Sequence, residues 1–347
     1  MTCLLKEKRN DIHSLFKFLK LFPSKMASLV IIIGSALLCS ALGATHPFAT
    51  REMVAKINSL QGSWRASLRT PTAQMSAEQF RSLLGARRDS SLGALPTKRF
   101  SAAQLAAAPE SYDPREHYGC KSMRQIRDQS QCGSCWAFGA VSSMSDRECM
   151  AHGKDIILSA EDVNSCSGGG DCGGGFPFSA YLYWQSEGII TEKCRPYSLP
   201  TCDHYAANSS NPCPAEDYPT PACNRSCVGG SGLTWKEDKH RAAAVYMVSG
   251  ESEMMAELSA GGPCEATMDV YEDFLLYESG VYRHVTGEAR GSHAIKIMGY
   301  GVDGNNTKYW LCANSWNENW GEGGYFRILR GTDECAIEGT IICGTPE

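Results

Sequence analysis

The pattern of apolar positions predicts helices in the middle of the chain and strands toward its end. A helix is predicted from Cys135 to His152, where apolar residues recur at helical spacing: Trp136, Ala140, Val141 and Met144. Ser134 can cap its start and Gly153 can end it. A second helical stretch, 161–188, is interrupted by glycines at 168–170 and 173–175.

After Ala242 the pattern changes to short apolar runs that predict strands at 294–300, 309–313, 325–329 and 339–342. Helices therefore come first and strands later. This order predicts an α+β fold with two halves and a cleft between them. Between the halves, residues 194–227 contain five cysteines, several prolines and little periodicity, which indicates a disulfide-linked loop region.

The N-terminus carries an apolar run, Leu29 to Leu42, which is followed by the small-residue site Ala41-Leu42-Gly43. The run is too short to cross a bilayer comfortably, so we interpret residues 1–43 as a secretory signal region, with a signal anchor as the alternative. Of the 17 cysteines, 15 lie from Cys120 onward. This distribution fits disulfides in an oxidising compartment, whereas residues 44–107 contain no cysteine and form a candidate removable pro-region.

Charge divides the chain at Ala108. The residues before it include 15 basic and 5 acidic side chains, a net charge of +10, whereas the remaining 18 basic and 33 acidic side chains give −15. We therefore expect the pro-region to be held on the body partly by charge attraction. A body this acidic is a poor partner for nucleic acid.

The segment Cys132-Gly-Ser-Cys135-Trp136, preceded by Gln129, is the strongest chemical signal. A thiol attacks carbonyls as a thiolate, and the positive end of a helix lowers the thiol pKa. Cys135 has that position at the start of the predicted helix. Taken alone, two cysteines at this spacing could also form half of a zinc site or a redox pair, although we find no convincing second pair for zinc.

The base that a thiol nucleophile needs is found in Ser292-His293-Ala294, at the start of a predicted strand. A lone histidine is usually a packed residue, but Asn314-Ser-Trp316 follows 21 residues later, just after the next strand. An asparagine carbonyl can hold an imidazole in one tautomer while a tryptophan excludes water. Cysteine, histidine and asparagine together are far more specific than any one of them.

These motifs resemble the papain family of cysteine proteases, from about Ala108 to the end of the chain. The resemblance implies Cys135 as the nucleophile, His293 as the general base and acid, Asn314 as the residue that orients the histidine, and Gln129 as an oxyanion-hole donor. It implies a two-domain fold in which a mainly helical left domain, 108–230, faces a β-barrel-like right domain, 231–347, across the active-site cleft. No metal or cofactor is implied.

The spacing of 158 residues between Cys135 and His293 exceeds the family's usual ~130–150. The insertion contains Cys194-Arg-Pro-Tyr-Ser-Leu-Pro-Thr-Cys202-Asp-His204-Tyr205, which resembles the occluding loop of the cathepsin B group, about 199–219 here. The resemblance implies a latch between Asp128 and His204, and binding of a substrate's terminal carboxylate by His204. The group's second histidine is replaced by Tyr205, which carries no charge, so we expect weakened dipeptidyl carboxypeptidase activity beside endopeptidase activity.

The resemblance also implies a substrate wall made by Gly174 and Gly175, with Trp316 nearby. A second unprimed pocket is implied, lined by Phe176, Pro177 and Ala294. Where the cathepsin B group has a glutamate that accepts arginine, this chain has Thr340. We therefore expect the pocket to prefer apolar side chains.

The remaining expectations from the resemblance concern processing and partners. The implied disulfides are Cys120–Cys149, Cys132–Cys172, Cys166–Cys223, Cys194–Cys227 and Cys202–Cys213, while Cys264 could pair with Cys343.

The implied partners are protein and peptide substrates, the chain's own pro-peptide as inhibitor, and inhibitors of the cystatin type, with no nucleic acid and no membrane after signal removal. The implied destination is the secretory pathway, to a lysosome or another acidic vesicle or out of the cell. Candidate glycan sites are Asn208, Asn224 and Asn305.

Overall fold

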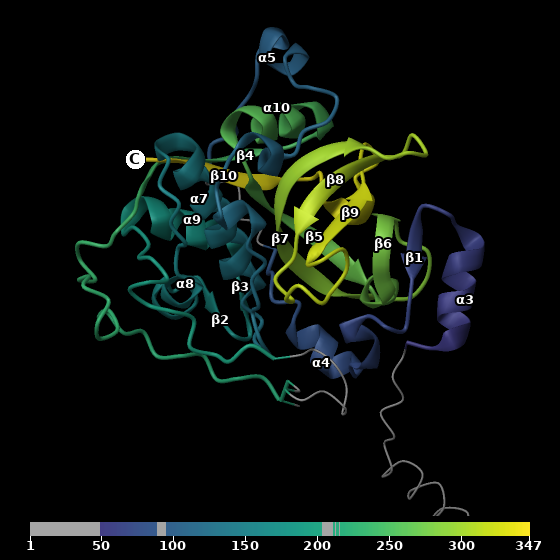
Figure 1. Ribbon diagram of the computed structural model, residues 1–347, viewed down its shortest axis with the longest axis horizontal. Coiled ribbons are helices and arrows are strands. Elements are labelled where there is room, and N and C mark those ends of the chain that lie inside the picture. Colours follow the sequence, from purple (N-terminus) through teal and green to yellow (C-terminus); the bar gives the residue numbers. More distant parts are fainter. Residues whose placement is uncertain (1–48, 89–94, 203–210, 212, 215) are drawn as a thin grey trace, which may run out of the picture. The chain divides into compact units, whose positions relative to one another are not determined.

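The computed structural model in Figure 1 describes residues 49–88, 95–202, 211, 213–214 and 216–347. The expected signal region 1–43 and the loop residues His204, Tyr205 and Asn208 lie outside this part of the chain. No helix of the described ranges combines the length and the apolar character needed to cross a membrane.

The elements follow the predicted order of helices first and strands later. The helices are α3 (Arg51–Leu60), α4 (Ala77–Ser82), α5 (Ala102–Ala106), α6 (Pro114–His117), α7 (Cys135–His152), α8 (Ala160–Cys166), α9 (Pro177–Ser186) and α10 (Glu251–Gly261). Short 3-10 turns are η1 (Pro71–Gln74), η3 (Ser122–Arg124), η4 (Glu272–Leu276) and η5 (Glu334–Ala336). The strands are β1 (Trp64–Ala66), β2 (Gly170–Asp171), β3 (Gly174–Gly175), β4 (Ala242–Val248), β5 (Cys264–Tyr271), β6 (Tyr277–Tyr282), β7 (Ala289–Val302), β8 (Lys308–Ala313), β9 (Tyr325–Leu329) and β10 (Ile341–Pro346).

Helix α7 is the central helix, and its boundaries are those predicted from the sequence. It is buried on nearly all sides because the helical core and the sheet both pack against it. Gly153 ends it in a left-handed conformation at φ 67°, which glycine adopts without strain. The prediction that Ser134 caps its start is wrong, because the Ser134 hydroxyl instead bonds the Tyr197 hydroxyl at 2.9 Å.

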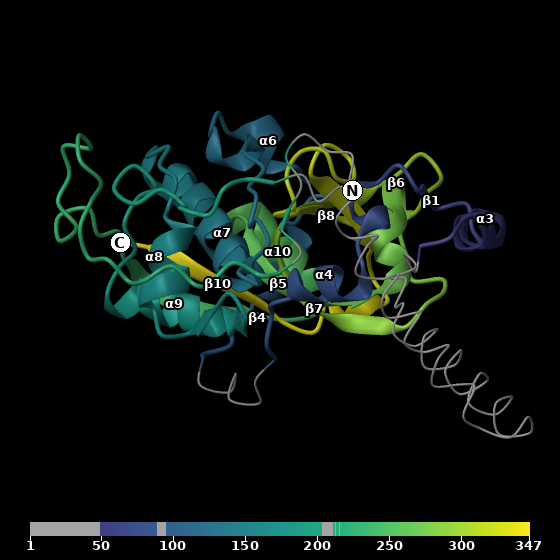
Figure 2. The same ribbon diagram turned by 90° about the horizontal axis from the view of Figure 1, so that it is seen from below.

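The strands form one eight-stranded sheet in the order β1-β6-β9-β8-β7-β5-β10-β4, which does not close into a barrel among the described residues. Only β6 and β9 pair in parallel. An aromatic core lies against this sheet and includes Tyr277, Trp310, Trp320 and Phe326. A second core joins α7 and α9 through Trp136, Phe138, Tyr181 and Trp184. Figures 1 and 2 show α7, α8 and α9 gathered on one side and β6, β8 and β9 on the other.

The segment expected to be the pro-region adds to the sheet instead of standing apart from it. Its strand β1 pairs antiparallel with β6, with Trp64 opposite Gly280. The Trp64 ring packs into the core beside Tyr277 and Tyr282. Residues 77–82 of the same segment form α4, whose Ser76 and Gln79 form a capping box.

All five disulfides implied by the resemblance are present, and Cys264–Cys343 is a sixth. Cys135, Cys312 and Cys335 are free and buried. A network of covalent links through the helical half and the loop region fits the oxidising compartment inferred from the sequence.

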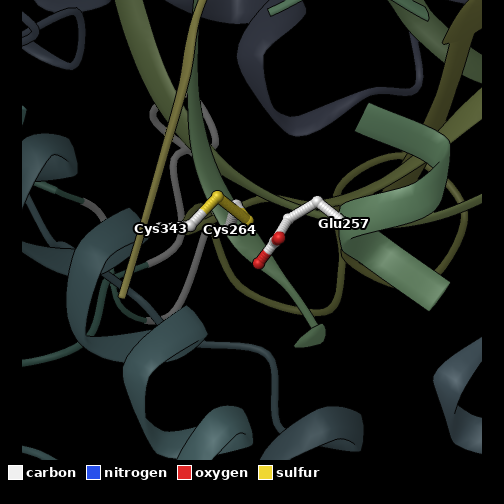
Figure 3. Close-up of side chains that lie close together, drawn as sticks. All are labelled: Glu257, Cys264 and Cys343. Atoms are coloured by element: carbon white, nitrogen blue, oxygen red, sulfur yellow. A yellow bond between two sulfur atoms is a disulfide. The ribbon is translucent and has the colours of Figure 1, made fainter. Parts of the chain in front are cut away.

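Figure 3 shows the Glu257 carboxylate next to the Cys264–Cys343 disulfide. These three side chains are close enough to share an ion, but the two sulfur atoms are bonded to each other and are not thiolates. The Arg147 guanidinium donates to Glu257 Oε1 at 2.8 Å and lies 2.9 Å from Cys264 Sγ. The group is therefore a buried ion pair beside a disulfide.

Candidate active site

The fold brings Cys135 and the segment around His293 together. Cys135 is the first residue of α7, and His293 lies on β7, which packs against that helix. The buried Cys135 contacts Ala294, the residue after His293, and Ala86 of the pro-region. Backbone N–H groups of Ala294, Gly85 and Trp136 point at the Cys135 thiol. The sequence alone does not show this proximity, because the two residues are far apart in the chain.

The histidine is oriented as expected. His293 Nε2 lies 2.8 Å from the Asn314 side-chain oxygen, which also accepts the Ser315 N–H at 2.8 Å. Because that oxygen can only accept, the imidazole carries its proton on Nε2, and Nδ1 remains for proton exchange. The Trp316 ring covers the imidazole at a centroid distance of 4.6 Å, and both side chains are fully buried.

Gln129 has its amide group fixed by bonds on both sides. Its Oε1 accepts the Ser315 hydroxyl at 2.7 Å, so Nε2 faces the cleft and donates to the carbonyls of Cys132 (2.8 Å) and Leu83 (3.1 Å). Leu83 belongs to the segment expected to be the pro-region, so this segment contacts the side chain that the resemblance implies as an oxyanion-hole donor.

The pro-region also covers the substrate wall. Gly175 N–H donates to the Gly85 carbonyl at 2.8 Å, and Arg87 N–H donates to the Gly175 carbonyl at 2.8 Å. Ala86 pairs in parallel with Gly175. A Cβ on Gly174 would lie 2.7 Å from the Gly85 carbonyl oxygen, so glycine at this position allows the close approach of the segment that contains Gly85.

Burial keeps the Cys135 thiol and the His293 imidazole neutral in this structure. It raises the pKa of the Cys135 thiol to about 12, an effect that the surrounding backbone N–H groups only partly oppose. Burial lowers the pKa of His293 to about 4 against smaller opposite contributions from the Asn314 side chain and the Leu83 carbonyl. A thiolate–imidazolium pair is therefore not formed in this covered state.

Pro177 and Thr340, two of the residues that the resemblance assigns to the second unprimed pocket, line one cavity of about 390 Å³. Arg87 and Arg88 of the pro-region also line it. Phe176 and Ala294, which were also expected to line this pocket, are not among its lining residues. The Arg87 guanidinium lies 5.9 Å from the Phe176 ring centroid, and Ala294 contacts Cys135.

The described part of the expected occluding loop packs beside the oxyanion segment. Ser130 donates its hydroxyl to the Pro200 carbonyl at 2.7 Å, and Cys202 is linked to Cys213. Asp128 accepts the Ser130 N–H at 2.7 Å. His204 lies outside the described residues, so the expected contact between it and Asp128 stays a prediction.

Two positioning residues were not identified from the sequence. Tyr197 donates its hydroxyl to the Gln129 carbonyl at 3.0 Å, and Ser315 holds the Gln129 side chain. Ser315 stands inside the Asn-Ser-Trp motif, which could have drawn attention to it. No pattern in the sequence marks Tyr197, which comes from the loop region.

Comparisons with known proteins agree with this geometry. The family described as papain family cysteine protease matches residues 108–345. Cathepsin B-like cysteine proteinase 6 of Caenorhabditis elegans is 47% identical over 254 residues, which are 69% of this chain and 67% of the relative. The cathepsin B-like cysteine proteinase of Schistosoma japonicum is 47% identical over 249 residues, covering 68% and 72% of the two chains.

Among solved structures, proCathepsin B S9 from Trypanosoma congolense superposes with a TM-score of 0.78 at 37% identity, covering 87% of this chain and 100% of that one. The stem bromelain precursor, at 24% identity and a TM-score of 0.65, shares the fold. The chain belongs to the papain family of cysteine proteases, as a cathepsin B-like peptidase.

Proposed function

We propose that Cys135 is the nucleophile of this peptidase and His293 its proton carrier. The thiol proton moves to His293 Nδ1, because Nε2 is engaged with Asn314. The thiolate forms a bond to the scissile carbonyl carbon, and the imidazolium then gives its proton to the amide nitrogen, which leaves as an amine. A water molecule next gives a proton to His293 and attacks the thioester carbonyl carbon. The tetrahedral intermediate then collapses: the carbon–sulfur bond breaks, the imidazolium returns its proton to the Cys135 sulfur, and the carboxylic acid product is released.

Gln129 Nε2 and the Cys135 backbone N–H are proposed as the oxyanion-hole donors. The supporting observation is that Gln129 Nε2 already donates to a backbone carbonyl, that of Leu83. Because Ser315 fixes the amide, little reorganisation is needed when charge develops on a substrate oxygen.

The observation that carries this assignment is that Cys135 contacts Ala294, the residue directly after His293, while the Asn314 side chain bonds the His293 ring at 2.8 Å. Labelling with a thiol-directed epoxide at acidic pH tests it. We expect one equivalent on Cys135 after removal of the pro-region and much slower labelling before it. Labelling of Cys312 or Cys335 in its place would exclude Cys135 as the nucleophile.

The pro-region occupies the cleft and is proposed as the inhibitor that keeps the enzyme inactive. Within residues 49–88 and 95–107, five ion pairs connect it to the described body, and each has its base on the pro-region and its acid on the body: Arg65–Glu278, Arg87–Asp171, Arg88–Asp269, Lys98–Glu257 and Arg99–Glu253. This placement of bases and acids is the one expected from the net charges of +10 before Ala108 and −15 from Ala108 onward. Most are exposed and individually weak, so the cleft contacts and the Trp64 anchor carry much of the affinity.

We further propose an endopeptidase with weakened dipeptidyl carboxypeptidase activity. One loop histidine, His204, remains to bind a terminal carboxylate, while Tyr205 can offer only a hydrogen bond without charge. We expect a peptide with a free C-terminal carboxylate to be shortened by two residues faster than its amidated twin, but more slowly than internal bonds of long peptides are cleaved. Equal rates for the two peptides would show that the loop does not bind the terminal carboxylate of a substrate.

The second unprimed pocket is proposed to prefer apolar side chains at acidic pH. Thr340 offers no negative charge, and a charge-assisted hydrogen bond to arginine is worth roughly 1.5–3 kcal/mol, or about 10- to 100-fold in rate. We expect Phe-Arg substrates to be cleaved with higher kcat/KM than Arg-Arg substrates at about pH 5. In the Thr340→Glu variant we expect the difference in kcat/KM between the two substrates to be smaller. A higher kcat/KM for Arg-Arg at that pH would contradict this mapping.

The remaining proposals extend the resemblance. We propose boundaries at 43/44, 107/108 and 230/231, on the basis of the charge division and of the change from helices to strands along the chain. The disulfides support passage through the secretory pathway, and an acidic vesicle is the proposed destination. Asn224 and Asn305 are exposed and are proposed glycan sites, and cystatin-type inhibitors are proposed to bind the open cleft.

A further inference from the structure

The C-terminal part of the pro-region extends the outer edge of the sheet. Strand β4 is the last strand in the sheet order, so one of its sides has no partner strand among the described residues. The segment 96–98 lies along this side: Met247 N–H donates to the Pro96 carbonyl at 2.8 Å, and Lys98 N–H donates to the Met247 carbonyl at 2.9 Å. Thr97 pairs in parallel with Met247. An extended segment therefore binds the edge of β4 through its backbone, as in strand addition to a sheet.

Lys98 places its charge on a buried acid of the body. Its ammonium donates to Glu257 Oε2 of α10 at 2.6 Å and lies 4.8 Å from the Tyr246 ring centroid. The Glu257 side chain is 0% exposed, whereas the acids of the other four ion pairs between pro-region and body are 18–56% exposed. The Lys98–Glu257 pair is therefore less screened by water and salt than the other four.

Two groups of the body orient the Glu257 carboxylate. The Arg147 guanidinium and the Tyr246 hydroxyl each donate to its Oε1 at 2.8 Å. Within the described part of the chain, Oε2 has one donor, the Lys98 ammonium. Burial by itself would raise the pKa of this carboxyl, but the Arg147 guanidinium and the Lys98 ammonium together lower it below its usual value. When the pro-region leaves, Arg147 still holds the carboxylate, and Oε2 is left as an acceptor for another cation.

The residues on either side of the lysine also have places on the body. Leu95 is 5% exposed and packs in the helical core, and Phe100 packs against the aromatic core. The Arg99 guanidinium pairs at 3.0 Å with Glu253, one turn of α10 before the acid that binds the lysine. The segment 95–100 is thus held by apolar contacts at both ends and by basic side chains between them.

We propose that the edge of β4 and the neighbouring face of α10 become a second binding site when the pro-region leaves. The site takes an extended segment of a protein substrate that carries a lysine between two apolar residues, as the segment 95–100 does in the zymogen. We call it the edge site, and its members are Tyr246, Met247, Glu253 and Glu257. Unfolded protein substrates offer extended segments, and the net charge of −15 on the body attracts basic ones. This inference rests on the proposed removal of the pro-region.

The binding test uses mature enzyme whose Cys135 is blocked by a thiol-directed epoxide, so that nothing is cleaved. Mass spectrometry first confirms that the sample begins near Ala108. The probe is a fluorescent peptide of residues 95–101, followed by fluorescence anisotropy at about pH 5 and low salt. We expect saturable binding, and binding about 10- to 100-fold weaker for the Lys98→Gln peptide, which loses a charge-assisted hydrogen bond. The Arg99→Gln peptide is the control and should lose less than about 5-fold, because its ion pair is more exposed.

Variants of the enzyme locate the bound peptide. Glu257→Gln removes the charge that receives the lysine, so it should weaken the unsubstituted peptide by the same 10- to 100-fold. Glu253→Gln is the matched control on the same helix and should weaken it less than about 5-fold. The Lys98→Gln peptide needs no change in the enzyme, so the test stands even where Glu257→Gln does not fold.

A cleavage test with active enzyme shows whether the edge site serves substrates. Two peptides carry the same Phe-Arg bond, joined by a flexible Gly-Ser linker of about 30 residues to segment 95–101 with either Lys98 or Lys98→Gln. Such a linker spans up to about 100 Å, enough to reach both sites. We expect KM for cleavage at Phe-Arg to be about 10-fold lower with Lys98 and kcat to be the same, because the edge site raises the local concentration of the bond.

The inference is overturned by absence of saturable binding up to about 1 mM peptide, by equal affinity of the unsubstituted and Lys98→Gln peptides, or by equal KM values for the two linked substrates. A loss of affinity in Glu253→Gln as large as in Glu257→Gln also overturns it. None of these results affects the proposed function, which the epoxide labelling of Cys135 on the same sample decides. Failure of Cys135 to label would count against that function, while the peptide measurement would still decide the edge site.

Discussion

Cys135→Ala is expected to lower kcat by on the order of 10⁵-fold or more, because it removes the atom that bonds to the substrate carbonyl. Substrate binding should change little, since Cys135 lies at the bottom of the cleft and the glycine wall is untouched. The measurement is kcat and KM for a peptide amide after proteolytic removal of the pro-region by an added protease, because the variant cannot process itself.

Cys312→Ala is the matched control. Cys312 is also free and fully buried, and burial raises its thiol pKa well above the usual value, but it lies on β8 away from the α7 terminus. This variant should keep both activity and epoxide labelling. If Cys312→Ala lost activity to the same degree as Cys135→Ala, the loss would reflect damage to the fold and not loss of the nucleophile.

Gly85→Ala is expected to have the second largest effect, by weakening the hold of the pro-region on the cleft. A Cβ at Gly85 would lie 1.7 Å from the Gly133 carbonyl oxygen and 2.4 Å from its carbonyl carbon, and these are backbone atoms that cannot rotate away. Overpacking of this kind costs about 1–3 kcal/mol, or roughly 5- to 150-fold in an equilibrium constant. The intact zymogen should therefore open more often, and Cys135 in it should react with a small thiol reagent faster by about that factor.

Gly62→Ala provides the comparison within the same pro-region. No atom lies within 4 Å of a Cβ at Gly62, which is not in a left-handed conformation. Its zymogen should react as slowly as the unsubstituted one. An unchanged labelling rate in Gly85→Ala would show that contact between Gly85 and Gly133 does not hold the pro-region in place.

Predictions from the sequence succeeded where the signal was local or motif-based. The helical spacing from Cys135 to His152 gave the boundaries of α7, and the alternating run at 325–329 became β9. The predicted strand at 339–342 begins only at Ile341, because η5 and its left-handed residues Asp333, Cys335 and Ala336 occupy the preceding turn. Strands β4, β5 and β6 were not predicted, since their partners on the sheet are distant in the chain and buried runs lack clear alternation.

The site shows the same division. The motifs indicated Cys135, His293 and Asn314 as a set, but their meeting depends on the packing of α7 against β7. Tyr197 was not predicted from the sequence, because its hydrogen bond to the Gln129 carbonyl exists only once the loop region folds back onto that residue.

The sequence by itself determined the reaction class, since a thiol at the start of a helix, a histidine and an asparagine rarely occur together except in cysteine peptidases. The charge division also indicated that a basic pro-region is attracted to an acidic body. Tertiary structure alone decided that the pro-region lies in the cleft with the Leu83 carbonyl on Gln129 and that the catalytic pair is neutral there. The physical reason is that burial, and hence pKa and hydrogen-bond partner, depends on segments far apart in the chain, which a linear pattern does not bring together.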